Sequence, residues 1–200
     1  MKKALVFSIL ALFLANLGAA TTISDEEVTV DLESNRVEAV LDIESLTTET
    51  FNYQTSHPVS DLEVLINDEE ADCMVEQLAI GATINCETDL RENFQVQITY
   101  QTKNLVNSQE GVDVFRYSQS IYRPIQNYTF KVVLPEGSGV VDSEDATTNV
   151  ISPDYGQVGN MDGRRFFVQW DTNPELGESQ NFRVLFEPFE EEETSSKVLP

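Results

Sequence analysis

Apolar and polar residues alternate along much of this chain, and that alternation limits the possible folds more than any other feature. It is clearest where Phe94, Val96, Ile98 and Tyr100 alternate with Gln and Thr residues. A period of two places successive side chains on opposite faces of a β-strand, so that one face can be buried while the other meets water. The same alternation recurs at 28–32, 37–43, 62–66, 128–134, 166–170 and 182–186.

Turn-forming residues separate these runs, as at Asn67-Asp68 and Asp162-Gly163. Beyond residue 20, no segment sustains the apolar spacing of 3.6 residues that indicates an amphipathic helix. Short strands joined by turns predict an all-β protein. We expect an antiparallel β-sandwich of the immunoglobulin-like type.

The alternation breaks at 103–111, which suggests a division between two domains. We expect two tandem sandwich domains, an N-terminal one over residues 21–105 and a C-terminal one over residues 106–190. A single continuous sandwich is the alternative. The end of the chain carries a charged run with no apolar face, so residues 191–200 are expected to form a solvated acidic tail.

The first twenty residues have the order of a secretory signal peptide. Lys2 and Lys3 precede an apolar run at 4–14, and small residues follow at 18–20. The apolar run is shorter than the roughly 20 residues that cross a bilayer core, so it is not expected to be a permanent anchor. We expect residues 1–20 to form a signal helix that is removed after Ala20, and the protein to work in an extracytoplasmic location, secreted or at the cell surface.

The chain is strongly acidic, with 35 Asp and Glu against 12 Lys and Arg and a formal net charge of −23. Such a charge repels nucleic acid and anionic membrane surfaces, so neither is expected as a partner. Hydrophobic residues make up 40% of the chain, which is enough to build a core. Dispersed acid with only Lys103, Lys131 and Lys197 after the signal peptide favours a halophilic protein, and a very soluble exported protein is the alternative.

Cys73 and Cys86 are the only cysteines. A pair of cysteines in an exported protein indicates a disulfide, and this one would close a loop of roughly 14 residues. A redox site would more naturally show a Cys-x-x-Cys pair, which the sequence lacks. We therefore expect a structural Cys73–Cys86 bridge between neighbouring strands.

Few other residues are candidates for chemistry. Asn127-Tyr128-Thr129 is a glycosylation acceptor of the Asn-x-Ser/Thr type, so Asn127 is the expected glycosylation site. The single histidine, His57, is interpreted as a loop residue rather than a catalytic base or metal ligand. Acidic clusters at 25–27, 68–72 and 142–145 lack the spacing of a calcium loop, and a composition this acidic explains them.

The second half of the chain carries an order of motifs with a known parallel. A strand ends in Leu-Pro-Glu-Gly at 134–137, Asp-Gly-Arg-Arg at 162–165 opens a strand that ends in Trp170, and Leu-Gly-Glu-Ser at 176–179 leads into Phe-Arg-Val at 182–184. This order resembles the β-sandwich modules in ectodomains of archaeal and bacterial cell-surface proteins. The first half is similar to the module that accompanies them in membrane-anchored archaeal proteins. Those relatives usually continue into a transmembrane helix, whereas this sequence stops at Pro200.

These observations favour a non-catalytic binding or scaffold module that is exported to the cell surface or secreted. Its expected partners are cell-envelope components or other proteins, and no cofactor and no metal site are expected. Two alternatives remain open: the sensor ectodomain of a membrane protein that lacks its anchor, and an exported hydrolase that uses paired carboxylates.

Overall fold

The computed structural model describes residues 21–109, 111–142 and 149–189. The signal peptide expected at 1–20 and the acidic tail expected at 191–200 lie outside the described residues. Within the described ranges the chain forms strands and turns but no helix, which confirms the all-β prediction. No helix that could cross a membrane is therefore found in this part of the chain.

One large sheet holds eight strands in the order β14-β15-β11-β1-β2-β8-β4-β5. Its strands are β1 (Thr22–Asp31), β2 (Arg36–Ser45), β4 (Ser60–Ile66), β5 (Glu69–Glu70), β8 (Glu92–Gln101), β11 (Ile125–Val133), β14 (Gln157–Met161) and β15 (Arg165–Thr172).

Two smaller sheets complete the structure. The five-stranded sheet has the order β12-β16-β10-β9, with β13 paired to β16, and the three-stranded sheet has the order β3-β7-β6. Their strands are β9 (Val106–Gln109), β10 (Val112–Ser120), β12 (Ser138–Val140), β13 (Ile151–Ser152) and β16 (Ser179–Pro188), and then β3 (Thr50–Thr55), β6 (Cys73–Gln77) and β7 (Ala82–Glu87).

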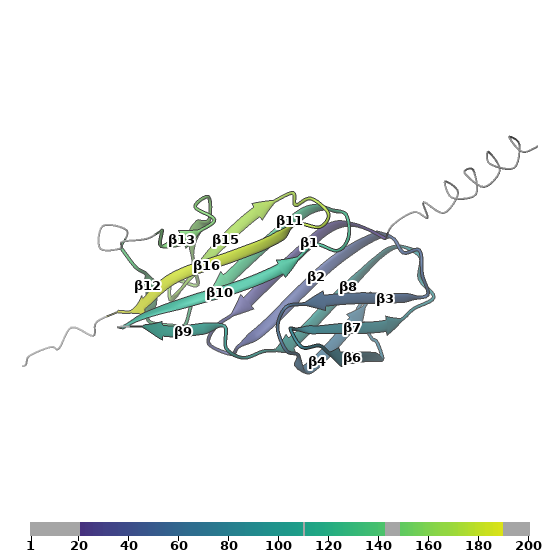
Figure 1. The fold of residues 1–200 in the computed structure, drawn as a ribbon, viewed down its shortest axis with the longest axis horizontal. Coiled ribbons are helices and arrows are strands. Elements are labelled where there is room, and N and C mark those ends of the chain that lie inside the picture. The colour runs from purple at the N-terminus through teal and green to yellow at the C-terminus, as the bar shows by residue number, and fades with distance from the viewer. Residues whose placement is uncertain (1–20, 110, 143–148, 190–200) are drawn as a thin grey trace, which may run out of the picture.

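The fold has two layers with one hydrophobic core between them. Figure 1 shows both smaller sheets on the same side of the large sheet, and a single core cluster joins the three sheets. Alternate residues of the large-sheet strands other than β5 and β14 point into this core. Phe94, Val96, Ile98 and Tyr100 are all buried, as the alternation of the sequence predicts.

The large sheet crosses the domain division expected at 103–111. β1 pairs in parallel with β11, in a register that runs from Ile23 opposite Ile125 to Asp31 opposite Val133. The regions expected as separate sandwiches, 21–105 and 106–190, therefore contribute strands to the same sheet. This topology fits the alternative of one continuous sandwich. The parallel central pair and the three sheets also differ from the antiparallel immunoglobulin-like arrangement that we expected.

Candidate functional site

Glu26 is an acidic residue at a core position of the large sheet. The pairing of β1 with β2 shifts register between Ile23 and Asp25, and beyond that irregularity Glu26 shares the inward face with Val28 and Val30. Only 4% of Glu26 is exposed. Its Oε1 atom is buried and has no hydrogen-bond partner among the described residues. A buried carboxyl oxygen without a partner is costly, which makes Glu26 the most unusual polar residue of the core.

Glu26 lines a pocket of about 150 Å³ between the large sheet and β3. The other polar side chains of its lining include Asn52 on β3, Gln119 at the end of β10 and Arg123 in the β10–β11 connection. Apolar residues such as Ile23 on β1 complete the wall. The pocket therefore combines apolar residues with polar groups from three separate segments of the chain, as small-molecule sites generally do.

The β10–β11 connection is held in place on both sides of Arg123. The Ile121 carbonyl accepts a hydrogen bond from the Gly177 N–H at 2.8 Å, and the Pro124 carbonyl accepts one from the Ile23 N–H at 3.1 Å. These backbone bonds tie the connection to the turn before β16 and to β1. The position of Arg123 in the pocket is thus set by the fold rather than by a free loop.

The Arg123 guanidinium has two partners. Its Nη2 atom donates a hydrogen bond to Asn52 Oδ1, and its Cζ atom lies 5.3 Å from the centroid of the Phe51 ring. The second distance is within the range of a cation–π interaction. Among the ion pairs of the described residues, none joins Arg123 to Glu26. The pocket therefore contains a carboxyl group and a guanidinium group that form no ion pair with each other.

Burial changes the protonation of both groups. Desolvation raises the pKa of Glu26 from 4.5 to about 7, and the positive charge of Arg123 opposes this shift. Desolvation also lowers the pKa of Arg123, against the effect of Glu26. Glu26 consequently titrates near neutral pH, which is unusual for a glutamate and typical of functional sites.

A cluster of buried tyrosines lies close to Glu26. The Tyr100 hydroxyl donates to Thr55 Oγ1 at 3.1 Å and lies 3.3 Å from the Tyr117 hydroxyl. The hydroxyls of Tyr53 and Tyr128 are buried without a partner in the described part of the chain. Desolvation raises the pKa of all four phenols, so they stay protonated at neutral pH. They make this region of the core polar but add no charge.

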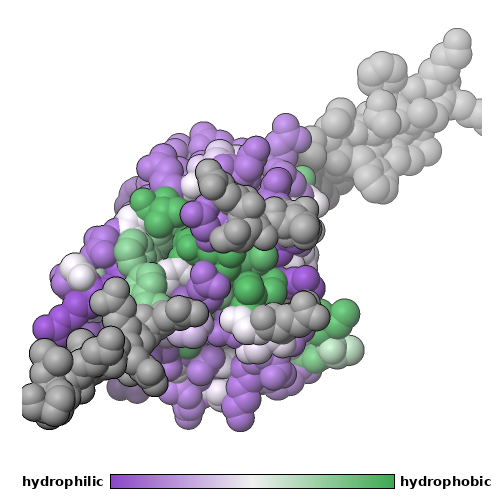
Figure 2. Space-filling model, turned by 90° about the vertical axis from the view of Figure 1, so that its left-hand side faces the viewer, coloured by the Kyte–Doolittle hydropathy of each residue, from purple (hydrophilic) through white to green (hydrophobic). Residues whose placement is uncertain are grey.

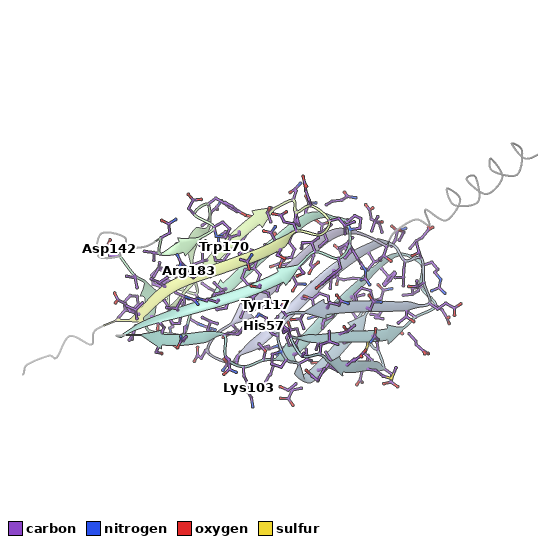
Figure 3. The ribbon with its side chains drawn as sticks, in the orientation of Figure 1. His57, Lys103, Tyr117, Asp142, Trp170 and Arg183 are labelled. Atoms are coloured by element: carbon purple, nitrogen blue, oxygen red, sulfur yellow. A yellow bond between two sulfur atoms is a disulfide. The ribbon has the colours of Figure 1, made fainter. Side chains whose placement is uncertain are left out.

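His57 lies outside the pocket lining and packs on the tyrosine cluster. Its ring stacks on Tyr117 with 4.5 Å between centroids, and Figure 3 shows the two labelled residues side by side. Burial lowers the pKa of His57, so the imidazole is neutral at pH 7. The structure gives His57 a packing role beside the core.

The disulfide expected between Cys73 and Cys86 is present. The two residues face each other on β6 and β7, with their Cα atoms 4.3 Å apart. Gly81, in the turn of this hairpin, has a φ of +82°, and a Cβ atom there would lie 1.8 Å from the Thr55 carbonyl oxygen. Glycine is thus required where the hairpin turns against the end of β3.

Asn127, the expected glycosylation site, lies inside β11. Its side chain is exposed on the outer face of the large sheet and donates a hydrogen bond to Asp25 Oδ1 at 3.0 Å. A glycan on Nδ2 would replace one of its two hydrogens and leave the other to donate this bond. Glycosylation of Asn127 stays a prediction.

The three acidic clusters do not form metal sites in the described residues. The cluster at 25–27 is split, because Asp25 and Glu27 are exposed while Glu26 points inward. The acids of the 68–72 cluster are all exposed around β5. Most of the 142–145 cluster lies outside the described residues. Across the described ranges, no group of three His, Cys, Asp or Glu side chains could hold a metal ion.

Two surface regions expose large apolar side chains. On the β6–β7 hairpin, Met74 is 70% exposed and Ile80 is 80% exposed. At the other end of the molecule, Val158 and Met161 on β14 and Phe189 after β16 are exposed, and Figure 2 shows hydrophobic residues gathered on that end face. Apolar side chains exposed in groups are common at protein contacts.

The comparisons with known proteins identify the fold but no family. No family model and no curated protein matches this chain. Native leukotriene A4 hydrolase from Saccharomyces cerevisiae matches with a TM-score of 0.51 and 12% identity, over 83% of this chain and 29% of that one. A substrate-bound mutant of the M1 zinc metallopeptidase from Deinococcus radiodurans matches with a TM-score of 0.50 and 10% identity, over 85% of this chain and 43% of that one.

This chain thus spans less than half the length of either solved protein. Identities this low establish a similar fold and nothing more. The structural likeness is to the β-rich portion of these proteins. The resemblance of the sequence to ectodomain modules of cell-surface proteins stays a prediction.

Proposed function

We propose that this protein is an exported, non-catalytic binding module of β-sandwich type, and that the pocket beside Glu26 is its ligand site. One observation carries the proposal: Glu26 on β1, Asn52 on β3, and Gln119 and Arg123 at the end of β10 and just beyond it line the same pocket. The Glu26 carboxyl has a buried oxygen without a partner in the described residues. Polar groups that converge beside apolar residues such as Ile23 and Leu41 are typical of a small-molecule site.

The composition of the pocket favours binding over catalysis. Hydrolysis by paired carboxylates needs two acids flanking the bond to be cleaved, roughly 5 to 10 Å apart. Glu26 is the only carboxyl among the described residues that line this pocket. Ser120 is its only lining serine, and His57, the single histidine of the chain, is not part of the lining. The nucleophile and base of a triad are therefore not brought together there.

An extracytoplasmic location is supported by two independent features. The first twenty residues have the order of a signal peptide. The Cys73–Cys86 disulfide fits an oxidising compartment. Cell-envelope components or other proteins remain the partners that we propose for the surface of the module.

The likeness to a leukotriene A4 hydrolase and to a zinc metallopeptidase does not change this proposal. In both cases the matched portion is less than half of the solved chain. A β-rich unit that forms part of a longer chain elsewhere fits a module that presents surfaces to other proteins. We do not propose that this chain has the activities named for those proteins.

The test measures both ligand binding and substrate hydrolysis by the purified chain. The purified chain would be titrated with a mixture of small polar molecules while backbone amide NMR signals are followed, and it would be incubated with peptide and polysaccharide substrates. We expect shifts at Glu26, Asn52 and Arg123 and no hydrolysis. Hydrolysis that disappears in Glu26→Gln, or binding confined to other surfaces, would contradict the proposal. Glu27→Gln is the matched control, since Glu27 is exposed on the opposite face of β1.

A further inference from the structure

We infer that the pocket takes a small zwitterion of the amino-acid type, with its ammonium group bound by Glu26 and its carboxylate bound by Arg123. The inference rests on the proposed ligand site and specifies the chemistry of the ligand.

Both charged groups of the pocket have unused hydrogen-bonding capacity. Glu26 Oε1 accepts no hydrogen bond from the described residues, although only 4% of the residue is exposed. The Arg123 guanidinium has five N–H donors, and one of its nitrogens is used by Asn52. Since no ion pair joins the two residues in the described structure, each can take a ligand group of opposite charge.

A ligand with a single charge would satisfy only one side of the pocket. An anion on Arg123 would leave the Glu26 oxygen unpartnered and would approach a chain whose net charge is −23. A cation on Glu26 would lie in the same pocket as the Arg123 guanidinium and would be repelled by it. A zwitterion carries no net charge and pairs with both groups, so it avoids both penalties.

The size and the wall of the pocket limit the rest of the ligand. A cavity of about 150 Å³ is one that admits benzene. The apolar residues Ile23, Leu41 and Ile125 line the pocket and favour a small apolar substituent. L-alanine fits a pocket of this volume and carries a small apolar substituent.

The experiment measures the affinity of the purified chain for L-alanine by isothermal titration calorimetry at pH 8 and fixed ionic strength. Propionate, which lacks the ammonium group, and L-alaninamide, which lacks the carboxylate, are the comparison ligands. We expect L-alanine to bind at least tenfold more tightly than either. Glu26→Gln and Arg123→Gln should each weaken L-alanine binding at least tenfold.

Two matched variants serve as controls. Glu27→Gln removes an exposed acid from the same strand, and Arg116→Gln removes an exposed arginine from β10. The affinity of both variants for L-alanine should stay within twofold of that of the unmodified chain. Circular dichroism and thermal melting establish that each variant is folded. If one pocket variant does not fold, the other variant and the comparison ligands still decide the result.

The outcomes separate the inference from the proposed function. The zwitterion inference is wrong if propionate or L-alaninamide binds in the pocket as tightly as L-alanine. It is also wrong if another small molecule binds there and L-alanine does not. In both cases the proposed ligand site is retained. L-alanine binding that is unchanged in both pocket variants also overturns the inference. If no small polar molecule shifts a pocket signal, both the inference and the ligand site fail.

Discussion

Arg165 binds Asp31 through two parallel hydrogen bonds, from Nη1 to Oδ2 at 2.9 Å and from Nη2 to Oδ1 at 2.8 Å. Asp31 ends β1 and Arg165 begins β15, with β11 between them in the large sheet. Arg165 Nε also donates to the Leu134 carbonyl at 3.1 Å. One side chain thus connects segments from both halves of the sequence, which is consistent with a sheet that crosses 103–111.

The Asp31–Arg165 pair should make a measurable contribution to stability. Partial burial would raise the pKa of Asp31, but hydrogen bonds from Arg165 and from the Ser34 and Glu33 backbone hold it below its ordinary value. We expect Asp31→Asn to lower the free energy of unfolding by about 2 kcal/mol at pH 7. A group with a depressed pKa stabilises the fold above its unfolded pKa of about 4 and loses that contribution as pH falls through its folded pKa.

Urea denaturation at pH 7 and at pH 3 would measure this effect. The difference between Asp31→Asn and the unmodified chain should shrink at the lower pH. Lys131→Gln is the matched control, because Lys131 pairs with the exposed Glu27 at 3.5 Å and such pairs contribute less than about 1 kcal/mol. Equal losses in the two variants at pH 7 would count against a special role for Asp31.

Glu26 should make stability fall as pH rises through neutrality. Its pKa is 4.5 when unperturbed and about 7 in the folded chain, where burial outweighs the attraction of Arg123. A raised pKa means that the protonated form is compatible with the fold, so the favourable contribution is complete below about 4.5 and is lost as pH rises through about 7. The full cost of ionising Glu26 is roughly 3 kcal/mol.

Denaturation of Glu26→Gln and of the unmodified chain at pH 4.5 and at pH 8 tests this prediction. The variant should gain stability relative to the unmodified chain as pH rises, because glutamine does not ionise. Glu27→Gln, on the exposed face of the same strand, should show no such relative gain. A parallel pH profile for all three proteins would mean that Glu26 is not desolvated.

The Cys73–Cys86 disulfide should stabilise the β6–β7 hairpin. The bridge closes a loop of roughly 14 residues, for which the chain-entropy model gives about 3 kcal/mol. We expect the double variant Cys73→Ala with Cys86→Ala to lose about that much stability, and a reducing agent to have no further effect on it. Mass spectrometry of exported protein under non-reducing conditions checks the bridge itself, and two free thiols there would contradict it.

Salt should stabilise this protein. The net charge is −23, and the described residues hold only four ion pairs. Repulsion among exposed carboxylates falls as the Debye length shrinks to about 3 Å near 1 M salt. We expect the melting temperature to rise between dilute buffer and about 1 M KCl. Glucose at the same osmolality controls for nonspecific solute effects, and an equal rise in both solutions would argue against charge screening.

The strands were predictable from the sequence, but their arrangement was not. The alternation from Phe94 to Gln101 determines which side chains of β8 are buried, because period two is a local property of the chain. The parallel pairing of β1 with β11 joins Ile23 to Ile125 across about a hundred residues. No local pattern specifies which distant strand lies beside another, so the break in alternation at 103–111 does not determine which strands share a sheet.

Only part of the candidate site could be predicted from the sequence. Glu26 lies in an acidic run that suggests a solvated cluster, yet it has the same parity as Val28 and Val30, and extending that alternation by one step would have placed it in the core. Arg123 follows β10 in an irregular connection that has no periodicity. Its approach to Asn52 depends on how β3 packs against the large sheet, which is a property of the tertiary structure.

The most direct test of this account is the titration of the Glu26 side-chain carboxyl by ¹³C NMR, without ligand and with saturating L-alanine. We expect a pKa of about 7 in the free chain, because burial outweighs the charge of Arg123. Saturation with L-alanine should lower that pKa, since an ammonium group beside the carboxylate favours its ionised form. A pKa near 4.5 in the free chain, or a raised pKa that L-alanine leaves unchanged, would contradict the account.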